Sequence, residues 1–164
     1  MKHFMTIARL MLLFLCIQSI AAAQALKQLP SFVKIHDIAN NGKLLQQAIP
    51  TKGKVMLIFY DPGCGHCQKL GASLSKAYAT LPPVQIYFVT MNDKEYVDSY
   101  LNMYAPALKG KKNVSFWKDP GVEFIERFMP KEYPATYIFD AGSKTLIKDF
   151  QGESDVQKIV PSLR

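Results

Sequence analysis

The stretch KVMLIFY, residues 54–60, is an almost uninterrupted apolar run of strand length. Such a run predicts a strand that is buried on both faces, as in a parallel sheet covered by helices. Apolar residues at helical spacing follow it and predict a helix over residues 65–80. A second apolar run, VQIYFVT at residues 84–90, predicts another strand. Because two strands joined by a helix run parallel in one sheet, we expect an α/β fold with this pair at its centre.

Further elements are expected on both sides of this strand–helix–strand unit. Asn92 followed by Glu95 is a capping-box variant and predicts the start of a helix that ends near Tyr104. No repeat or low-complexity linker interrupts the chain, so we expect one domain over residues 32–164, a central mixed β-sheet flanked by helices. The other expected elements are strands at 32–36, 114–119, 135–140 and 144–150, the last two forming an antiparallel hairpin, and helices at 42–48, 122–128 and from 154 onward.

Two details of the expected helices indicate close packing. Gly71 costs its helix about 1 kcal/mol relative to alanine, which indicates a kink or a close contact. Tyr96, Tyr100 and Tyr104 lie on one helix face, and we expect this stripe to pack in the core rather than to bind a ligand.

Residues 1–23 are not expected to belong to the domain. Lys2 and Arg9 precede the apolar run at residues 10–23, and AAAQA then offers small-residue cleavage sites, which is typical of a secretory signal peptide. A retained membrane anchor is the alternative, although the run spans about 21 Å as a helix against about 30 Å of hydrocarbon. We therefore predict a signal peptide, a lead-in at residues 24–31 and an exported domain, periplasmic or secreted.

The cysteines are the residues that this interpretation affects most. Cleavage would remove Cys16 and leave Cys64 and Cys67, which form a C-x-x-C pair. With no other thiol there is no disulfide framework to build, so the pair is expected to carry chemistry.

The basic residues exceed the acidic ones by a moderate amount. The formal net charge is +7, and it falls to +5 without Lys2 and Arg9. Lys109, Lys111 and Lys112 form the one cluster, which we interpret as a solvated loop in preference to a patch for anionic lipid or an acidic partner. Nucleic acid is not an expected partner, because no aromatic residues interleave with the basic ones.

The position of the cysteine pair predicts different roles for the two thiols. Cys64 should lie at a helix N-terminus, where unpaired N–H groups and the helix dipole stabilise its thiolate, so it is the expected attacking thiol. Cys67, one turn into the helix, is expected to be buried and to attack second. Gly65 and His66 lie between them, and a protonated His66 would favour the reduced form. We therefore expect a reduction potential nearer to protein disulfide isomerase, about −180 mV, than to thioredoxin, about −270 mV.

Metal binding is the competing interpretation of the same pair. Structural zinc needs four ligands, and only His36 and His66 remain as further soft donors. Haem attachment needs a histidine where Gln68 stands. We expect no metal or other cofactor, and copper capture by Cys64, Cys67 and His36 or two inert buried cysteines remain the alternatives.

The segment LIFYDPGCGHC resembles the active-site strand and turn of the thioredoxin superfamily. Its Gly65-His66 dipeptide is that of protein disulfide isomerase domains, and the exported single-domain layout resembles the TlpA and cytochrome c-maturation group. The resemblance spans roughly residues 32–164 and implies a thioredoxin-like fold. It also implies that Pro134 in EYPATYIFD follows a cis peptide bond and lies against the thiols. The backbone of Tyr133 would then pair with an extended substrate segment.

Two departures from the superfamily pattern matter for the chemistry. Gly63 replaces the usual tryptophan before the first cysteine, so the rim of the site is expected to be more open. Ile58 replaces the buried acid that helps to deprotonate the second cysteine. The base for Cys67 is thus open between Asp61, Glu132 and bound water.

The resemblance implies an enzyme, a protein thiol–disulfide oxidoreductase that acts on exported proteins containing cysteines or disulfides. No segment for dimerisation or a second domain is visible in the sequence, which favours a monomeric reductase over an isomerase. A reductase needs a membrane redox partner to supply electrons. Disulfide oxidase or isomerase activity remains the alternative direction, and the substrate is not indicated.

Overall fold

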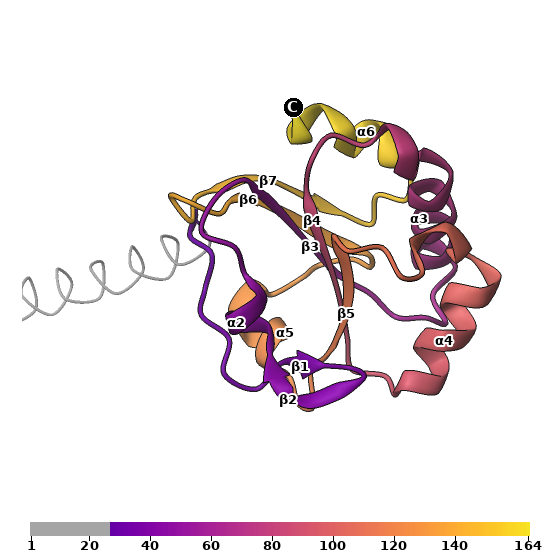
Figure 1. The fold of residues 1–164 in the computed structure, drawn as a ribbon, viewed down its shortest axis with the longest axis horizontal. Helices are drawn as coiled ribbons and strands as arrows, with labels where there is room; N and C mark the ends of the chain where they lie inside the picture. The colour runs from indigo at the N-terminus through magenta and orange to yellow at the C-terminus, as the bar shows by residue number, and fades with distance from the viewer. Residues whose placement is uncertain (1–26) are drawn as a thin grey trace, which may run out of the picture.

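The computed structural model describes residues 27–164. The predicted signal peptide and Cys16 lie outside the described residues. The chain forms one mixed, seven-stranded sheet in the order β2-β1-β5-β4-β3-β6-β7 (Figure 1). Its strands are β1 His36–Asp37, β2 Asn40–Leu44, β3 Lys54–Phe59, β4 Gln85–Thr90, β5 Val114–Lys118, β6 Ala135–Asp140 and β7 Leu146–Gln151. Its α-helices are α2 Leu45–Ala48, α3 Gly65–Ala77, α4 Lys94–Met103, α5 Glu123–Phe128 and α6 Val156–Ile159, and 3₁₀ turns span Tyr78–Thr80, Pro106–Leu108 and Val160–Leu163.

The pairing of the strands confirms the central prediction. β3 runs parallel to β4, and β4 runs parallel to β5. β6 and β7 form the expected antiparallel hairpin, and β6 lies antiparallel to β3 on its other side. As a result, the C-terminal ends of β3, β4 and β5 meet at one end of the sheet, and their N-terminal ends meet at the other.

Helices cover both faces of the sheet (Figure 1). Met56 and Ile58 of β3 pack in a core cluster that includes residues of α3, α4 and α6. Val55, Leu57 and Phe59 point to the other face and pack in a second cluster with residues of α2 and α5. All five side chains are buried, so β3 is buried on both faces, as its continuous apolar run predicts.

The prediction of a strand at residues 32–36 is wrong except at its last residue. The backbone N–H groups of Val33, Lys34 and Ile35 donate to the carboxylate of Glu123, so they are not available to a strand ladder. Phe32 and Ile35 are nevertheless buried in the second core cluster. A long-range carboxylate contact thus replaces the sheet pairing that the apolar pattern indicates.

The prediction of a helix at residues 42–48 is correct only for its second half. The chain turns back after β1, with Asp37 opposite Asn40, and residues 40–44 pair with β1 as the antiparallel strand β2. Residues 42–44 are therefore part of a strand and not of the helix. The Asp37 side chain accepts from the N–H of Ala39 in the turn between β1 and β2. Only Leu45–Ala48 is helical.

The predicted capping box at Asn92 is also wrong. The side-chain amide of Asn92 donates to Thr90 Oγ1, and the N-cap of α4 is Asp93. Within the tyrosine stripe, Tyr100 is buried as expected, whereas Tyr96 is 62% exposed at the first turn of the helix. No helix within residues 27–164 combines the length and the apolar character needed to cross a membrane.

Candidate active site

The turn after β3 places Cys64 at the start of α3. The Asp61 carboxylate accepts from the Gly63 N–H at 2.7 Å, and the Asp61 carbonyl accepts from the Cys64 N–H at 3.0 Å. Cys64 has extended backbone angles and is the N-cap residue of α3, which begins at Gly65. Its sulfur therefore lies where the helix dipole and unpaired N–H groups favour negative charge.

The two cysteines occupy different surroundings. Cys67 is buried in the first turn of α3, and Cys64 is only partly buried. Burial raises the pKa of the Cys67 thiol, a hydrogen bond from the backbone of Asp61 opposes this rise, and the neighbouring Cys64 adds to it. The pair thus combines an accessible sulfur with one that holds its proton.

The loop before β6 closes over Cys64. The Tyr133–Pro134 peptide bond is cis, as the resemblance implies. The Cys64 thiol lies 3.9 Å from the Tyr133 carbonyl oxygen, to which it can donate. Pro134 is buried, and its carbonyl accepts from the Gly152 N–H at 2.9 Å, which ties this loop to the end of β7. The structure therefore brings Cys64, Tyr133 and Pro134 together from distant parts of the chain.

His66 and Gly152 form the outer edge of the site. His66 is exposed, and its Nδ1 lies 3.4 Å from the Gly152 carbonyl oxygen. Gly152 has φ +69°, and a Cβ at this position would lie 2.4 Å from Glu132 Oε2. The positive φ favours glycine here, whereas the exposed Glu132 carboxylate could move aside. Gly65 has open space around it.

The candidate bases for Cys67 lie in different places. Asp61 contacts the Cys67 sulfur through its backbone, and its negative charge adds to the pKa rise of that thiol. Glu132 is exposed and lies against Gly152, on the His66 side of the site. Neither carboxylate forms a hydrogen bond with Cys67 in the structure.

Two buried tyrosines, Tyr60 and Tyr100, lie behind Cys67, and the sequence does not indicate that either belongs to the site. The Tyr100 hydroxyl donates to the Cys67 carbonyl oxygen at 3.0 Å. The Tyr60 ring lies 5.0 Å from the Tyr100 ring, and the Tyr60 hydroxyl has no hydrogen-bond partner among residues 27–164. Burial raises the pKa of both phenols.

Gly71 explains how Tyr100 reaches the cysteine helix. A Cβ on Gly71 would lie 2.2 Å from the Tyr100 hydroxyl oxygen, so the missing side chain makes room for it. The close contact that a mid-helix glycine indicates is therefore confirmed. The mid-helix Gly71 indicates a close contact in the sequence, but neither Gly71 nor Tyr100 shows which residue the other one meets.

His36 does not lie beside the cysteines. It belongs to β1, which pairs with β5, and β5 and β4 separate it from β3. Three strand spacings correspond to roughly 14 Å. Within residues 27–164, no group of three or more His, Cys, Asp and Glu side chains is arranged to hold a metal ion.

Comparison with known proteins agrees with this architecture. No family model matches the sequence. Human protein disulfide-isomerase A2 is 28% identical over 110 residues, which are 67% of this chain and 17% of that protein, so the chain spans only a small part of this relative's length. The structure is similar to a thioredoxin-like protein from Aeropyrum pernix, with a TM-score of 0.64, 12% identity and coverage of 89% and 92% of the two chains.

A second similar structure is a secreted disulfide oxidoreductase of Mycobacterium tuberculosis. It has a TM-score of 0.61 and 16% identity, with 85% of this chain and 96% of that chain covered. At such identities the likeness concerns the fold. The chain thus has the thioredoxin-like fold, in agreement with the resemblance of its cysteine segment.

Proposed function

We propose that this protein is an exported thiol–disulfide oxidoreductase that reduces disulfides in other proteins through Cys64 and Cys67. The observation that carries the proposal is the position of the Cys64 sulfur at the N-terminus of α3, 3.9 Å from the Tyr133 carbonyl oxygen. A reactive sulfur and an exposed backbone acceptor side by side are what an extended disulfide-bearing segment requires.

In the first step, the Cys64 thiolate attacks one sulfur of a substrate disulfide. The substrate S–S bond breaks, a Cys64–substrate disulfide forms, and the other substrate sulfur leaves as a thiolate that takes up a proton from solvent. The backbone of Tyr133 holds the substrate segment as an added strand. His66, at the edge of the site, favours the anionic form of Cys64 when its imidazole is protonated.

In the second step, Cys67 attacks the Cys64 sulfur of the mixed disulfide. The Cys64–substrate bond breaks, the Cys64–Cys67 disulfide forms, and the proton that Cys67 gives up ends on the released substrate thiol. Two electrons have then passed from the cysteine pair to the substrate. A membrane redox partner would return the pair to the dithiol form, and the same steps in reverse would make an oxidase.

Insulin reduction in the presence of dithiothreitol tests the chemistry. We expect the wild-type protein to accelerate the precipitation of the insulin B chain, and Cys64→Ser to abolish the acceleration. Wild-type protein that is no faster than dithiothreitol alone would contradict the proposal. Stoichiometric uptake of copper or zinc by such an inactive protein would instead favour the metal-carrier alternative.

The direction of exchange needs separate experiments. Equilibration with glutathione gives the reduction potential, which we expect near −180 mV, and a value as low as about −270 mV would contradict the role assigned to His66. Cys67→Ala should stall the reaction at the mixed disulfide, so that captured proteins identify the substrates. If the protein is a reductase, Cys67→Ala should capture proteins in wild-type cells, whose exported proteins contain disulfides. The same variant should capture none in cells that cannot form these disulfides.

A further inference from the structure

The basic residues are distributed unevenly over the molecule. The N-terminal ends of β3, β4 and β5 lie at the end of the sheet opposite to Cys64, and the turn between β6 and β7 joins them there, with Asp140 opposite Lys54. Lys52 and Lys54 flank Gly53 at the start of β3, and the Gly53 carbonyl accepts from the Ala141 N–H. Lys144 belongs to the β6–β7 turn itself.

Both ends of the described chain lie at the same end of the sheet. The Leu29 N–H donates to the Lys144 carbonyl, so Lys27 lies close to the β6–β7 turn. The Lys54 ammonium donates to the backbone oxygen of Arg164.

The connection before β5 and the last turn of α3 add four more lysines to this end. Asn113, which precedes β5, donates through its side chain to the Val84 carbonyl at the start of β4. The Lys111 ammonium lies over the ring of Tyr78, 5.0 Å from its centroid. Tyr78 directly follows α3, whose last turn contains Lys76. This group consists of Lys76, Lys109, Lys111 and Lys112.

We call these nine residues the basic end: Lys27, Lys52, Lys54, Lys144 and Arg164 together with Lys76 of α3 and the three lysines of the connection before β5. The chain segments that carry them contain a single acidic side chain, Asp140. Its carboxylate accepts from the N–H and hydroxyl of Ser143, which holds it within the turn. The side-chain ion pairs between residues 27 and 164 all involve other basic residues, Lys94, Lys118, Arg127 and Lys158. Asp140 lies opposite Lys54. The hydrogen bonds from Ser143 lower the pKa of the Asp140 carboxyl, and the charge of Lys54 contributes to this lowering, so Lys54 is partly compensated. The other eight basic residues form no ion pair among residues 27–164.

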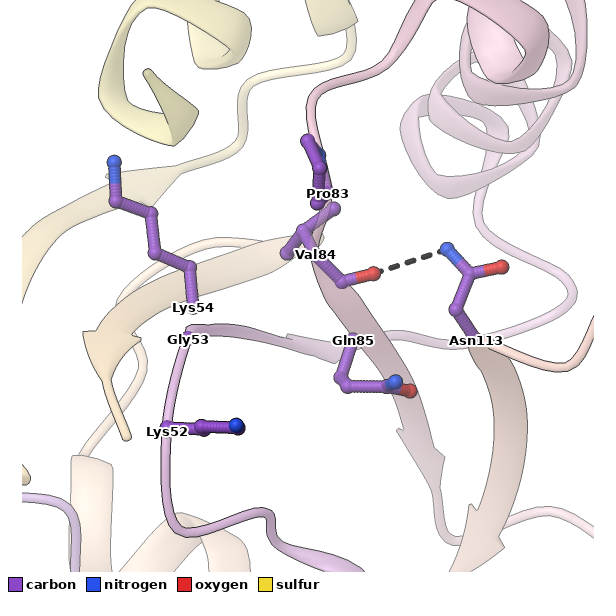
Figure 2. Close-up of a pocket in the computed structure, with 7 residues that line it drawn as sticks. All are labelled: Lys52, Gly53, Lys54, Pro83, Val84, Gln85 and Asn113. Atoms are coloured by element: carbon purple, nitrogen blue, oxygen red, sulfur yellow. Dashed lines mark hydrogen bonds between the residues drawn. The ribbon is translucent and has the colours of Figure 1, made fainter. Parts of the chain in front are cut away.

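A pocket opens in the middle of the basic end. Figure 2 shows that Lys52, Gly53 and Lys54 line one side of it, and Pro83, Val84, Gln85 and Asn113 line the other. The Lys54 side chain extends away from the Lys52 side chain, so the two ammonium groups do not converge on one point (Figure 2). The pocket is thus suited to a spread of negative charge rather than to one small anion.

The residues of this surface indicate which of two anionic partners it fits, an acidic protein or a layer of phospholipid headgroups. A specific protein interface has apolar or aromatic residues at its centre. The large apolar side chains that are exposed within residues 27–164 belong to other segments. Eight of the nine basic residues are lysines, which act as hydrated point charges and not as the planar forks that bind carboxylates in pairs. These properties fit a diffuse layer of phospholipid headgroups.

We propose that the basic end binds the surface of an anionic lipid bilayer and that the cysteine pair consequently faces away from it. Residues 10–23 precede Lys27 in the sequence, so a chain that keeps this run as a membrane anchor, the alternative to cleavage, would hold the basic end toward the membrane. At the other end of the sheet, Asp61 lies beside Cys67 and Glu132 lies against Gly152. Lys109, Lys111 and Lys112, which the sequence predicts to form a solvated loop, are joined in the fold by lysines from other segments.

Vesicle binding by the full-length protein tests this proposal. We compare vesicles of phosphatidylcholine with vesicles that also contain phosphatidylglycerol, so that binding through the apolar run contributes equally to both. The triple variant Lys52→Gln, Lys112→Gln and Lys144→Gln removes charge from the basic end. The matched control, Lys34→Gln, Lys69→Gln and Lys131→Gln, removes the same charge elsewhere. None of these six side chains has a hydrogen bond or ion pair among residues 27–164.

We expect the wild-type protein to prefer the anionic vesicles, and the basic-end variant to lose more than about tenfold of this preference. The control should lose less than about twofold, and high salt should remove the preference in all three proteins. Cys64 on bound protein should react with a soluble maleimide at an unchanged rate. Equal losses in the two variants, no preference for anionic vesicles, or protection of Cys64 would each overturn the proposal.

Discussion

Cys64 and Cys67 have the same side chain, but the fold gives them different proton affinities and different access to partners. Cys64 terminates a turn and faces the Tyr133 carbonyl, whereas Cys67 is enclosed by α3 and by the tyrosines behind it. Burial favours the neutral thiol of Cys67 and shields its sulfur, so the more accessible Cys64 is expected to attack first. The order of the two steps therefore follows from the depth of the two sulfurs.

The pH dependence of the second step should reveal this difference. Because burial holds the pKa of Cys67 above its ordinary value, its thiolate fraction rises about tenfold per pH unit between pH 7 and 9. The release of a chromogenic thiol from its mixed disulfide with Cys64, followed in single turnovers, should accelerate by the same factor. Cys67→Ala should show no release, and a rate that levels off below pH 8 would contradict the raised pKa.

The contact between Gly71 and Tyr100 predicts a coupled effect on stability. Gly71→Ala places a methyl group against the Tyr100 hydroxyl and should lower the free energy of unfolding by about 2 kcal/mol. Tyr100→Phe removes the hydroxyl, so the alanine should cost at least about 1 kcal/mol less in that background. Urea unfolding of the four proteins measures this. Gly65→Ala, which meets no neighbour, is the control, and additive effects would refute the contact.

At the scale of elements, sequence patterns predicted the helices and strands correctly where the local preference of a segment agrees with its place in the fold. The runs that became β3, β4 and β6 are continuous and apolar, and the structure confirms them, together with α3 and the final hairpin. Residues 32–36 failed as a strand because the Glu123 carboxylate, about 90 positions away in the chain, binds their N–H groups. Likewise, no local pattern indicates that Tyr133 meets Cys64. That juxtaposition was available only through the resemblance to a known superfamily.

The link between α5 and the segment before β1 should be a major contributor to stability. Glu123 is buried and accepts from Val33, Lys34 and Ile35, at 2.9, 2.8 and 3.3 Å. Glu123→Gln replaces one acceptor oxygen with a donor, so at least one N–H loses its partner. We expect a loss of about 2–3 kcal/mol in the free energy of unfolding by urea. Glu126→Gln, exposed on the same helix, should change it by less than about 0.5 kcal/mol, and equal effects would refute the assignment.

At the scale of the whole molecule, one sheet separates two core clusters, and the cysteine pair and the basic end lie at opposite ends of its central strands. The cluster under α3, α4 and α6 contains Cys67, and the cluster under α2 and α5 contains Trp117, the single tryptophan. Both clusters use side chains of β3 and β4, which alternate between the two faces. If either cluster were lost, one face of β3 and β4 would be exposed to water. The other cluster depends on the same two strands.

The two core clusters should consequently unfold together. In a Cys64→Ser variant, Trp117 fluorescence reports one cluster, and pulse labelling of Cys67 with a thiol reagent reports the other. We expect both signals to change at the same urea concentration, because β3 cannot keep one face packed while the other is exposed to water. Labelling of Cys67 well before the fluorescence changes would mean that α3 separates from the sheet on its own. The cysteine helix would then be an independent unit, and the position of Cys64 against Tyr133 would not be fixed by the fold as a whole.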